Sequence, residues 1–123
     1  MEFEILSKRI LGCAIEVHRE LGPGLLESTY EKCLLHELRE NSINCIAQIA
    51  LPVTYKGFHI DCGYRIDLLV EESIIVELKS VDLLQQIHEA QLLTYMKLAK
   101  IKTGLLINFN TRMLKNGIKR LVL

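Results

Sequence analysis

Apolar positions at the start of the chain repeat with the period of an α-helix. From Leu6 the apolar stripe continues at intervals of three and four residues to Leu21, and it stops at residues 22–24, Gly-Pro-Gly. A left-handed glycine cap and a proline both end a helix there. A second stripe at i, i+4 spacing begins at Leu26 and ends near Asn41. The pattern therefore predicts two consecutive amphipathic helices.

Strict alternation of apolar and polar residues follows and predicts β-strands. One strand is expected over residues 43–53. After a turn at Lys56-Gly57, a second is expected over residues 58–70, with its even-numbered apolar residues on the core face. Only Glu71 to Ser73 interrupt the pattern before the segment SIIVELKS, so the last two strands are predicted to form a hairpin folded about Glu72.

That hairpin pairs residues whose numbers add to 144. The apolar pairs Val70 with Ile74, Leu68 with Val76, and Ile66 with Leu78 define the expected core face, and Arg65 faces Lys79. Asp67 then lies opposite Glu77, and Cβ atoms of directly opposed residues are about 4.5 to 5.5 Å apart. Two carboxylates at that distance repel unless a cation lies between them or a pKa is raised.

The remaining pattern predicts one helix and two strands. A helix is expected from about Leu84 to Ala99, with His88, Gln91 and Tyr95 on one face. A buried strand at residues 104–108, a tight turn at 116–117 and a last strand at 118–122 complete the chain. No linker or repeat divides the sequence, so residues 1–123 are expected to form a single mixed α/β (α+β) domain.

Composition excludes several classes of protein. Fifteen Lys and Arg residues balance fifteen Asp and Glu residues, so polyanion binding requires a local site rather than the field of the whole molecule. No apolar run is long enough to span a bilayer, and the first ten residues do not resemble a signal peptide. We therefore expect a cytoplasmic protein without a membrane partner. Four cysteines without C-x-x-C spacing argue against a zinc knuckle or a disulfide framework.

Candidate chemistry concentrates on the predicted hairpin. Glu77 and Lys79 are two residues apart on one strand and project to the same face, beside Asp67. Two carboxylates suit a hard divalent ion such as Mg²⁺, and an adjacent lysine could hold or help deprotonate a water molecule. This set of groups is suited to metal-assisted hydrolysis of a phosphodiester.

The pattern D-x(n)-E-x-K on adjoining strands resembles the PD-(D/E)XK nuclease superfamily. Residues 24–30, GLLESTY, are similar to the G-x-x-E-x-x-Y signature of a small, mostly prokaryotic branch named after that motif. Residues 91–95, QLLTY, are similar to the Q-x-x-x-Y motif of recombination-type exonucleases. The resemblance extends from about Leu6 to Val122, and one departure is Ile66 in place of the proline that names the superfamily.

This resemblance implies a restriction-endonuclease-like αβββαβ core, with a mixed central sheet flanked by helices. It implies a Mg²⁺-dependent nuclease, with Mn²⁺ as a second suitable ion, that cleaves DNA or RNA, DNA being favoured. Asp67 and Glu77 would bind the metal, with Glu27 as a further carboxylate, and Lys79 would position or activate the water. Gln91 and Tyr95 would contact the nucleic acid or brace the site. Homo-oligomerisation stays open.

Other interpretations remain at this stage. The chain could be a non-catalytic module that binds nucleic acid or protein and keeps the nuclease fold, or an accessory subunit of a larger complex. Glu27 could simply favour a helix N-terminus, and Gln91 with Tyr95 could form an ordinary polar seam. Two groups of basic residues either flank the acidic centre or are solvated surfaces: Lys97, Lys100 and Lys102, and Arg112, Lys115, Lys119 and Arg120.

Overall fold

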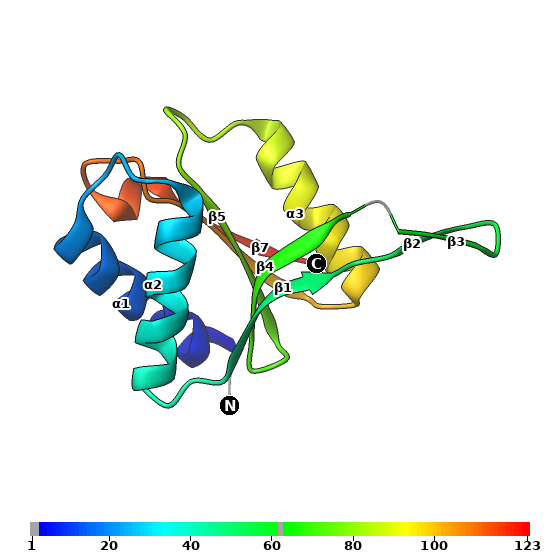
Figure 1. The fold of residues 1–123 in the computed structure, drawn as a ribbon, viewed down its shortest axis with the longest axis horizontal. Coiled ribbons are helices and arrows are strands. Elements are labelled where there is room, and N and C mark those ends of the chain that lie inside the picture. The colour runs from blue at the N-terminus through cyan, green and yellow to red at the C-terminus, as the bar shows by residue number, and fades with distance from the viewer. Residues whose placement is uncertain (1–2, 62) are drawn as a thin grey trace.

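The fold is a mixed sheet between two layers of helices (Figure 1). The computed structural model describes residues 3–61 and 63–123. The elements in chain order are α1 (Phe3–Leu21), α2 (Glu27–Glu40), β1 (Cys45–Ala50), β2 (Val53–Tyr55), β3 (Phe58–Ile60), β4 (Arg65–Val70), β5 (Ile74–Lys79), α3 (Gln86–Ala99), β6 (Thr103–Asn108), the 3₁₀ helix η1 (Leu114–Gly117) and β7 (Ile118–Val122). The mixed α/β class and the expected order of the main helices and strands are confirmed.

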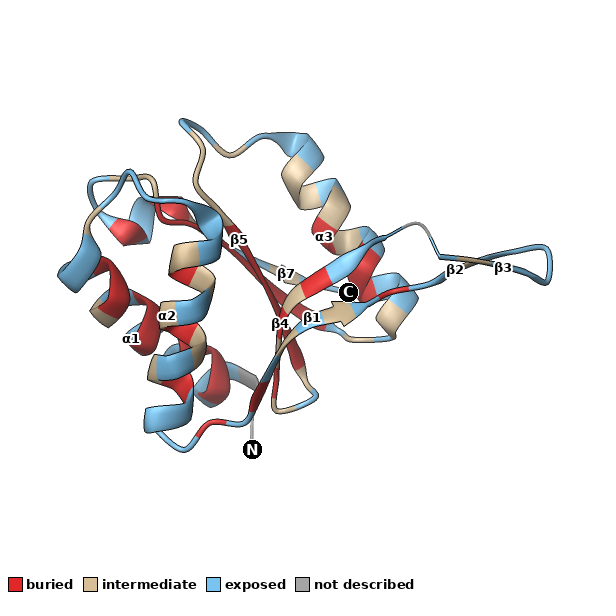
Figure 2. Cartoon of the chain, viewed as in Figure 1, coloured by how far each residue is buried: buried red, intermediate tan, exposed pale blue. Residues whose placement is uncertain are grey.

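The central sheet has the strand order β1-β4-β5-β6-β7. β5 and β6 run parallel and are connected through α3, whereas the other neighbours run antiparallel. Helices α1 and α2 cover one face and α3 covers the other, so buried residues line both faces of β5 and β6 (Figure 2). A strand buried on both faces reads as a continuous apolar run, as β5 and β6 do.

The predicted register between β4 and β5 is confirmed over three pairs, from Val70 with Ile74 to Leu68 with Val76. Beyond the pair Leu68–Val76, no ladder pairing is recorded between these strands. The expected pairing of Ile66 with Leu78 on one core face was wrong. Ile66 packs into the cluster beneath α3, and Leu78 into the cluster beneath α1 and α2. The two strands separate where the candidate acids lie.

The predicted second strand, residues 58–70, is divided in the structure. Leu51 and Pro52 end β1, and β2 and β3 then form a separate two-stranded hairpin that projects from the body (Figure 1). Its turn lies at Lys56-Gly57, as expected, with both residues at positive φ. Phe58 is 67% exposed, so the expectation that it faces the core was wrong. A turn in which the Gly63 amide donates to the Asp61 carboxylate separates β3 from β4.

The predicted termini of the helices agree closely with the structure. Gly22 has φ of +71°, and its amide donates to the carbonyl of His18, which gives the left-handed cap expected at the end of α1. Within the described ranges no helix is long and apolar enough to cross a membrane. Cys62, expected to be buried, lies outside the described residues.

Candidate active site

Asp67 and Glu77 hold the separated strands together through their side chains. The amide of Asp67 donates to Glu77 Oε1 at 3.1 Å, and the amide of Leu78 donates to Asp67 Oδ2 at 2.9 Å. The carboxylates therefore accept bonds that carbonyl oxygens accept in an ordinary ladder. Glu77 is 5% exposed and Asp67 is partly buried. In the part of the chain that the structure describes, the second oxygen of each side chain makes no main-chain hydrogen bond. The expected proximity of the two acids is confirmed.

The environment favours protonation of this pair. Burial, followed by the charge of Asp67, raises the pKa of Glu77 to about 8. Burial also raises the pKa of Asp67 above its ordinary value, opposed by hydrogen bonds from the Leu78 amide and from Glu77 and by the charge of Lys79. In the cation-free protein Glu77 therefore favours its protonated form at neutral pH. A positive group placed between the carboxylates replaces that proton.

Lys79 connects the acids to helix α3. Its Nζ donates to Gln91 Oε1 at 3.4 Å, and Gln91 Nε2 donates to the Tyr95 hydroxyl at 3.0 Å. The three side chains form a chain from the end of β5 to the buried face of α3, as their spacing predicts. His88 shares this face, but its Nδ1 accepts the amide of Gln85 in a capping box that starts the helix.

Glu27 lies at the first residue of α2, and its side chain is exposed. It lines a hollow with Leu25 and Ser80, and the Ser80 hydroxyl donates to the carbonyl of Leu25 at 2.6 Å. Ser80 follows Lys79 directly, so Glu27 lies near the carboxyl end of β5. Among the residues that the structure describes, no group of three or more acidic, His or Cys side chains is close enough to hold a metal ion. Glu27 is thus not brought together with Asp67 and Glu77 as a third ligand.

The tyrosine of the G-x-x-E-x-x-Y segment is structural. Tyr30 is fully buried and stacks on Phe109 with ring centroids 4.5 Å apart. Its hydroxyl donates to the carbonyl of Gly22 at 2.6 Å and accepts the amide of Leu25 at 3.1 Å. The loop before α2 is thereby tied to the core, and this fixes where the helix begins.

Sequence reasoning missed a carboxylate on the next turn of α2. Glu31 accepts a hydrogen bond from Gln48 Nε2 at 2.6 Å, and burial raises its pKa, with Asp67 adding a smaller effect of the same sign. Gln48 lies between Ala47 and Ile49, which pair with Leu68 and Ile66 on either side of Asp67, and it has φ of +56°. Gln48 also forms a side-chain hydrogen bond that lowers the pKa of Asp67. The available signal was the i, i+4 spacing from Glu27, which puts Glu31 on the same helix face.

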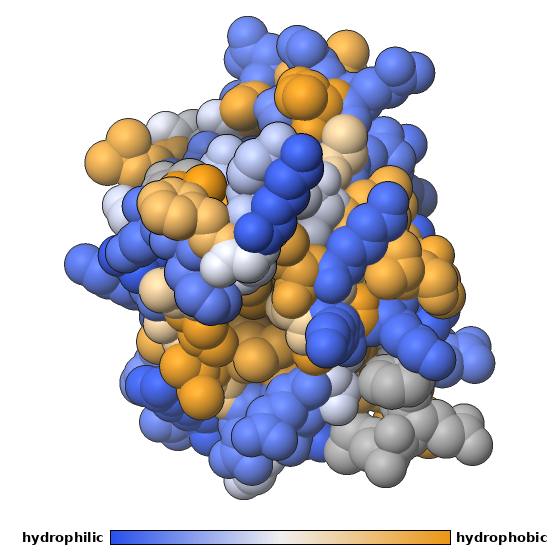
Figure 3. Space-filling view, turned by 90° about the vertical axis from the view of Figure 1, so that its right-hand side faces the viewer, coloured by the Kyte–Doolittle hydropathy of each residue, from blue (hydrophilic) through white to orange (hydrophobic). Residues whose placement is uncertain are grey.

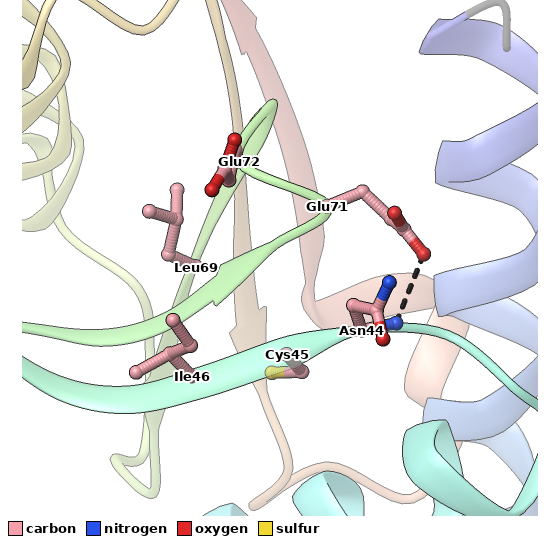
Figure 4. Close-up of a pocket in the computed structure, with 6 residues that line it drawn as sticks. All are labelled: Asn44, Cys45, Ile46, Leu69, Glu71 and Glu72. Atoms are coloured by element: carbon pink, nitrogen blue, oxygen red, sulfur yellow. Dashed lines mark hydrogen bonds between the residues drawn. The ribbon is translucent and has the colours of Figure 1, made fainter.

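A second hollow lies at the other end of β1 and β4 and has a volume of about 350 Å³ (Figure 4). Glu71 closes one side by accepting the amide of Asn44 at 2.9 Å. Burial raises the pKa of Cys45 to about 11, so its thiol stays protonated at neutral pH. The side chains around this hollow therefore offer no activated nucleophile, and the acid pair on β4 and β5 is the stronger candidate.

The two basic groups occupy different ends of the sheet. Lys79 pairs with Asn108 at the carboxyl ends of β5 and β6, and Arg112 and Lys115 follow that end of β6. Lys100 and Lys102 lie just before the start of β6, at the opposite end of the strands from Lys79. Of the two alternatives left open for the basic groups, flanking the acids does not hold for Lys100 and Lys102.

Comparison with known proteins identifies a family for this chain. A family model described as the PD-(D/E)XK nuclease superfamily matches residues 4–121. The searches of curated proteins and of solved structures gave no significant match. The match covers both acids, Lys79 and the sheet that carries them. The chain belongs to the PD-(D/E)XK nuclease superfamily.

Proposed function

We propose that this protein is a metal-dependent nuclease that hydrolyses phosphodiester bonds in nucleic acid. The observation that carries the proposal is the close pair of buried Glu77 and partly buried Asp67, with Lys79 two residues after Glu77 on the same strand. Like charges buried together destabilise a fold unless a cation compensates them. Membership in a nuclease superfamily supports a nucleic acid as the partner, and DNA is the substrate we favour over RNA.

The donor set fits Mg²⁺ or Mn²⁺. Both acids offer hard carboxylate oxygens, and Mg²⁺ typically keeps several waters and needs only one or two protein carboxylates with substrate phosphates. The second oxygens of Asp67 and Glu77 would hold the ion. Bound there, the ion would act as a Lewis acid on the phosphoryl oxygen. Glu27, at the mouth of the site, would serve as an outer carboxylate rather than a direct ligand.

The remaining groups have separate roles. The Lys79 ammonium would orient the attacking water and balance charge that develops on the phosphoryl group. Gln91 would hold Lys79 in that position through the 3.4 Å hydrogen bond, and Tyr95 would fix the amide of Gln91. Glu31 and Gln48 would keep Asp67 in place from the β1 side.

We also propose the branch of the superfamily to which this chain belongs. The G-x-x-E-x-x-Y segment, with Tyr30 tying the loop to the core and Glu27 beside Ser80, supports membership in the branch named after that motif. We further propose that residues 1–123 act as one nuclease-like domain.

The test is cleavage of plasmid and single-stranded DNA and RNA by the purified protein with Mg²⁺, with Mn²⁺ and with a chelator. Lys79→Met is expected to reduce the rate by at least about a hundredfold, since removing one preorganised charge-stabilising donor typically has that effect. Lys102→Met is the matched control, because Lys102 is exposed and lies at the end of the strands opposite to Lys79.

Calorimetric titration of the ions, with Asp67→Asn as the variant and Glu72→Asn as the control, tests the ligands separately. Cleavage that survives both Lys79→Met and Glu77→Gln would show that the site is elsewhere. The absence of any metal-dependent cleavage would favour a binding module that keeps the nuclease fold.

A further inference from the structure

An apolar groove is lined in part by Gln91, the residue that accepts the hydrogen bond from Lys79. It has a volume of about 550 Å³ and lies between α3 and the base of the projecting hairpin. We call it the tyrosine groove, and the lining residues used here are Val53, Tyr64, Ile87, Gln91, Tyr95 and Leu98. Figure 3 views the molecule from the side on which the hairpin projects, and hydrophobic residues gather there between hydrophilic ones.

Two tyrosines shape the groove. The rings of Tyr64 and Tyr95 have centroids 6.1 Å apart and are tilted by 55°. Tyr64 is 44% exposed, whereas Tyr95 is 5% exposed and is held through its hydroxyl by Gln91. One ring is therefore open to a ligand and the other is fixed. Exposed aromatic faces next to aliphatic side chains such as Ile87, 67% exposed, offer a stacking surface for a flat ring.

The groove adjoins the candidate active site through Gln91. Gln91 lines the groove and also accepts the hydrogen bond from Lys79. The side chain of Gln91 thus lies between a ligand in the groove and Lys79, the group proposed to act on the phosphate. The occupant that fits an apolar, aromatic groove at this position is the base of a nucleotide whose phosphate lies at the acids.

The β2–β3 hairpin carries further exposed aromatic side chains next to the groove. Val53, at the start of β2, lines the groove, and Tyr55 and Phe58 beyond it are 60% and 67% exposed. Lys56 lies between them, with its Nζ 5.4 Å from the centre of the Tyr55 ring. Exposed aromatics interleaved with a cation are the combination that binds single-stranded nucleic acid, because bases stack and the backbone is neutralised.

We propose that the tyrosine groove binds an unpaired nucleobase, so that the substrate of this protein is single-stranded nucleic acid or a frayed end. A base within an intact duplex is stacked and paired and cannot enter such a groove without being extruded. This inference rests on the proposed nuclease function for the position of the phosphate, and it adds the class of substrate.

The test is fluorescence anisotropy of labelled oligonucleotides in EDTA, which prevents metal-dependent cleavage. The full chain is titrated against a single-stranded DNA, the RNA of the same sequence, and the blunt DNA duplex. We expect single strands to bind more tightly than the duplex, and the two single-stranded arms identify the preferred sugar. Tyr64→Ala is expected to weaken single-strand binding by roughly tenfold or more, because stacking on one ring is lost.

Two variants serve as controls. Tyr64→Phe keeps the ring and is expected to bind like the wild type. Ile46→Ala removes an exposed apolar side chain, 56% exposed, that lines the hollow at the other end of β1, and it is expected to have no effect. Unchanged binding by Tyr64→Ala, or a preference for the duplex, would overturn the inference.

A measurement on the wild type keeps the test independent of folding of the variants. An oligonucleotide that carries 5-iodouracil is irradiated with the protein, and the crosslinked peptide is identified by mass spectrometry. Crosslinks to Tyr64 or Tyr95 are expected, and crosslinks found only elsewhere, Tyr55 included, would contradict the groove. Metal-dependent cleavage without binding in the groove would overturn the groove inference and leave the nuclease proposal intact. If the wild-type protein shows neither metal-dependent cleavage nor binding in the groove, both proposals are overturned.

Discussion

At the residue scale, Asp67 and Glu77 have a structural role in addition to the cation binding proposed for them. Their carboxylates accept the main-chain amides of Leu78 and Asp67 at the point where β4 and β5 separate. The strands cannot supply carbonyl acceptors there, so the acids complete the sheet as well as offering oxygens to a cation. The raised pKa of Glu77 follows from this burial beside a second acid.

The stability of the cation-free protein is expected to fall as pH rises from about 5 to 9. The pKa of Glu77 is about 8 in the folded protein against 4.5 ordinarily, so between these values the folded state binds more protons than the unfolded state. The contribution of Glu77 to stability is therefore complete below its pKa in the unfolded protein. That contribution is lost as pH rises through its pKa in the folded protein. A decrease in Tm on the order of 5–10 °C is expected in EDTA by thermal unfolding.

Glu77→Gln removes this dependence, because the amide imitates the protonated acid at every pH. The difference in Tm between Glu77→Gln and the wild type should therefore grow as pH rises. Glu72→Gln, at the exposed turn of the same hairpin, should follow the wild type. Parallel profiles for Glu77→Gln and the wild type would show that Glu77 has an ordinary pKa.

At the element scale, sequence patterns predict the helices and the β4–β5 register because these depend on local periodicity. The alternation through residues 58–70 is also local, yet it spans the boundary between β3 and β4. Positive φ at Gly63 and the Asp61 carboxylate that accepts its amide end that strand, and this Asp-x-Gly turn is visible in the sequence.

The site shows the same division between local and tertiary information. The opposition of Asp67 and Glu77 and the seam from Lys79 to Gln91 follow from spacing within neighbouring elements. The contact between Glu31 and Gln48 joins segments that only the packing of α2 against the sheet edge brings together. Periodicity within α2 and β1 cannot specify that contact.

Tyr30→Phe tests how α2 is placed. Loss of the hydroxyl leaves the Gly22 carbonyl and the Leu25 amide without their partner, and a lost hydrogen bond typically costs about 0.5–1.5 kcal/mol where water can reach the groups. We expect lower stability in urea unfolding and reduced cleavage, because Glu27 follows directly after the loosened loop. Tyr55→Phe, at a 60% exposed position, is the control, and equal stabilities of the two variants would contradict the role of Tyr30.

At the scale of the whole molecule, charge is balanced overall and unevenly placed. Fifteen basic and fifteen acidic residues cancel, so affinity for phosphates must come from position. The sheet topology puts Arg112 and Lys115 beyond the carboxyl end of β6, beside the end of β5 that carries Lys79, and it puts Lys100 and Lys102 at the opposite end of the strands.

The double substitution Arg112→Gln with Lys115→Gln is expected to weaken oligonucleotide binding and to reduce its salt dependence. Loss of two phosphate contacts with a single strand reduces the magnitude of the negative slope of log K against log salt concentration by about 1.4. Anisotropy measured between low and moderate salt gives this slope. Lys100→Gln with Lys102→Gln removes the same charge and should leave affinity and slope unchanged, and equal losses in both double variants would show that only net charge matters.

The double role of the acids also shapes how this chain can diverge. In a descendant freed from selection for the proposed cleavage, Asp67→Asn keeps an oxygen for the amide of Leu78, whereas Asp67→Ala leaves that buried amide without an acceptor. Selection on folding alone would therefore tolerate amides at these two positions and reject small apolar residues. Asn and Gln in place of the two acids would be the expected mark of a relative that binds nucleic acid and has ceased to cut it.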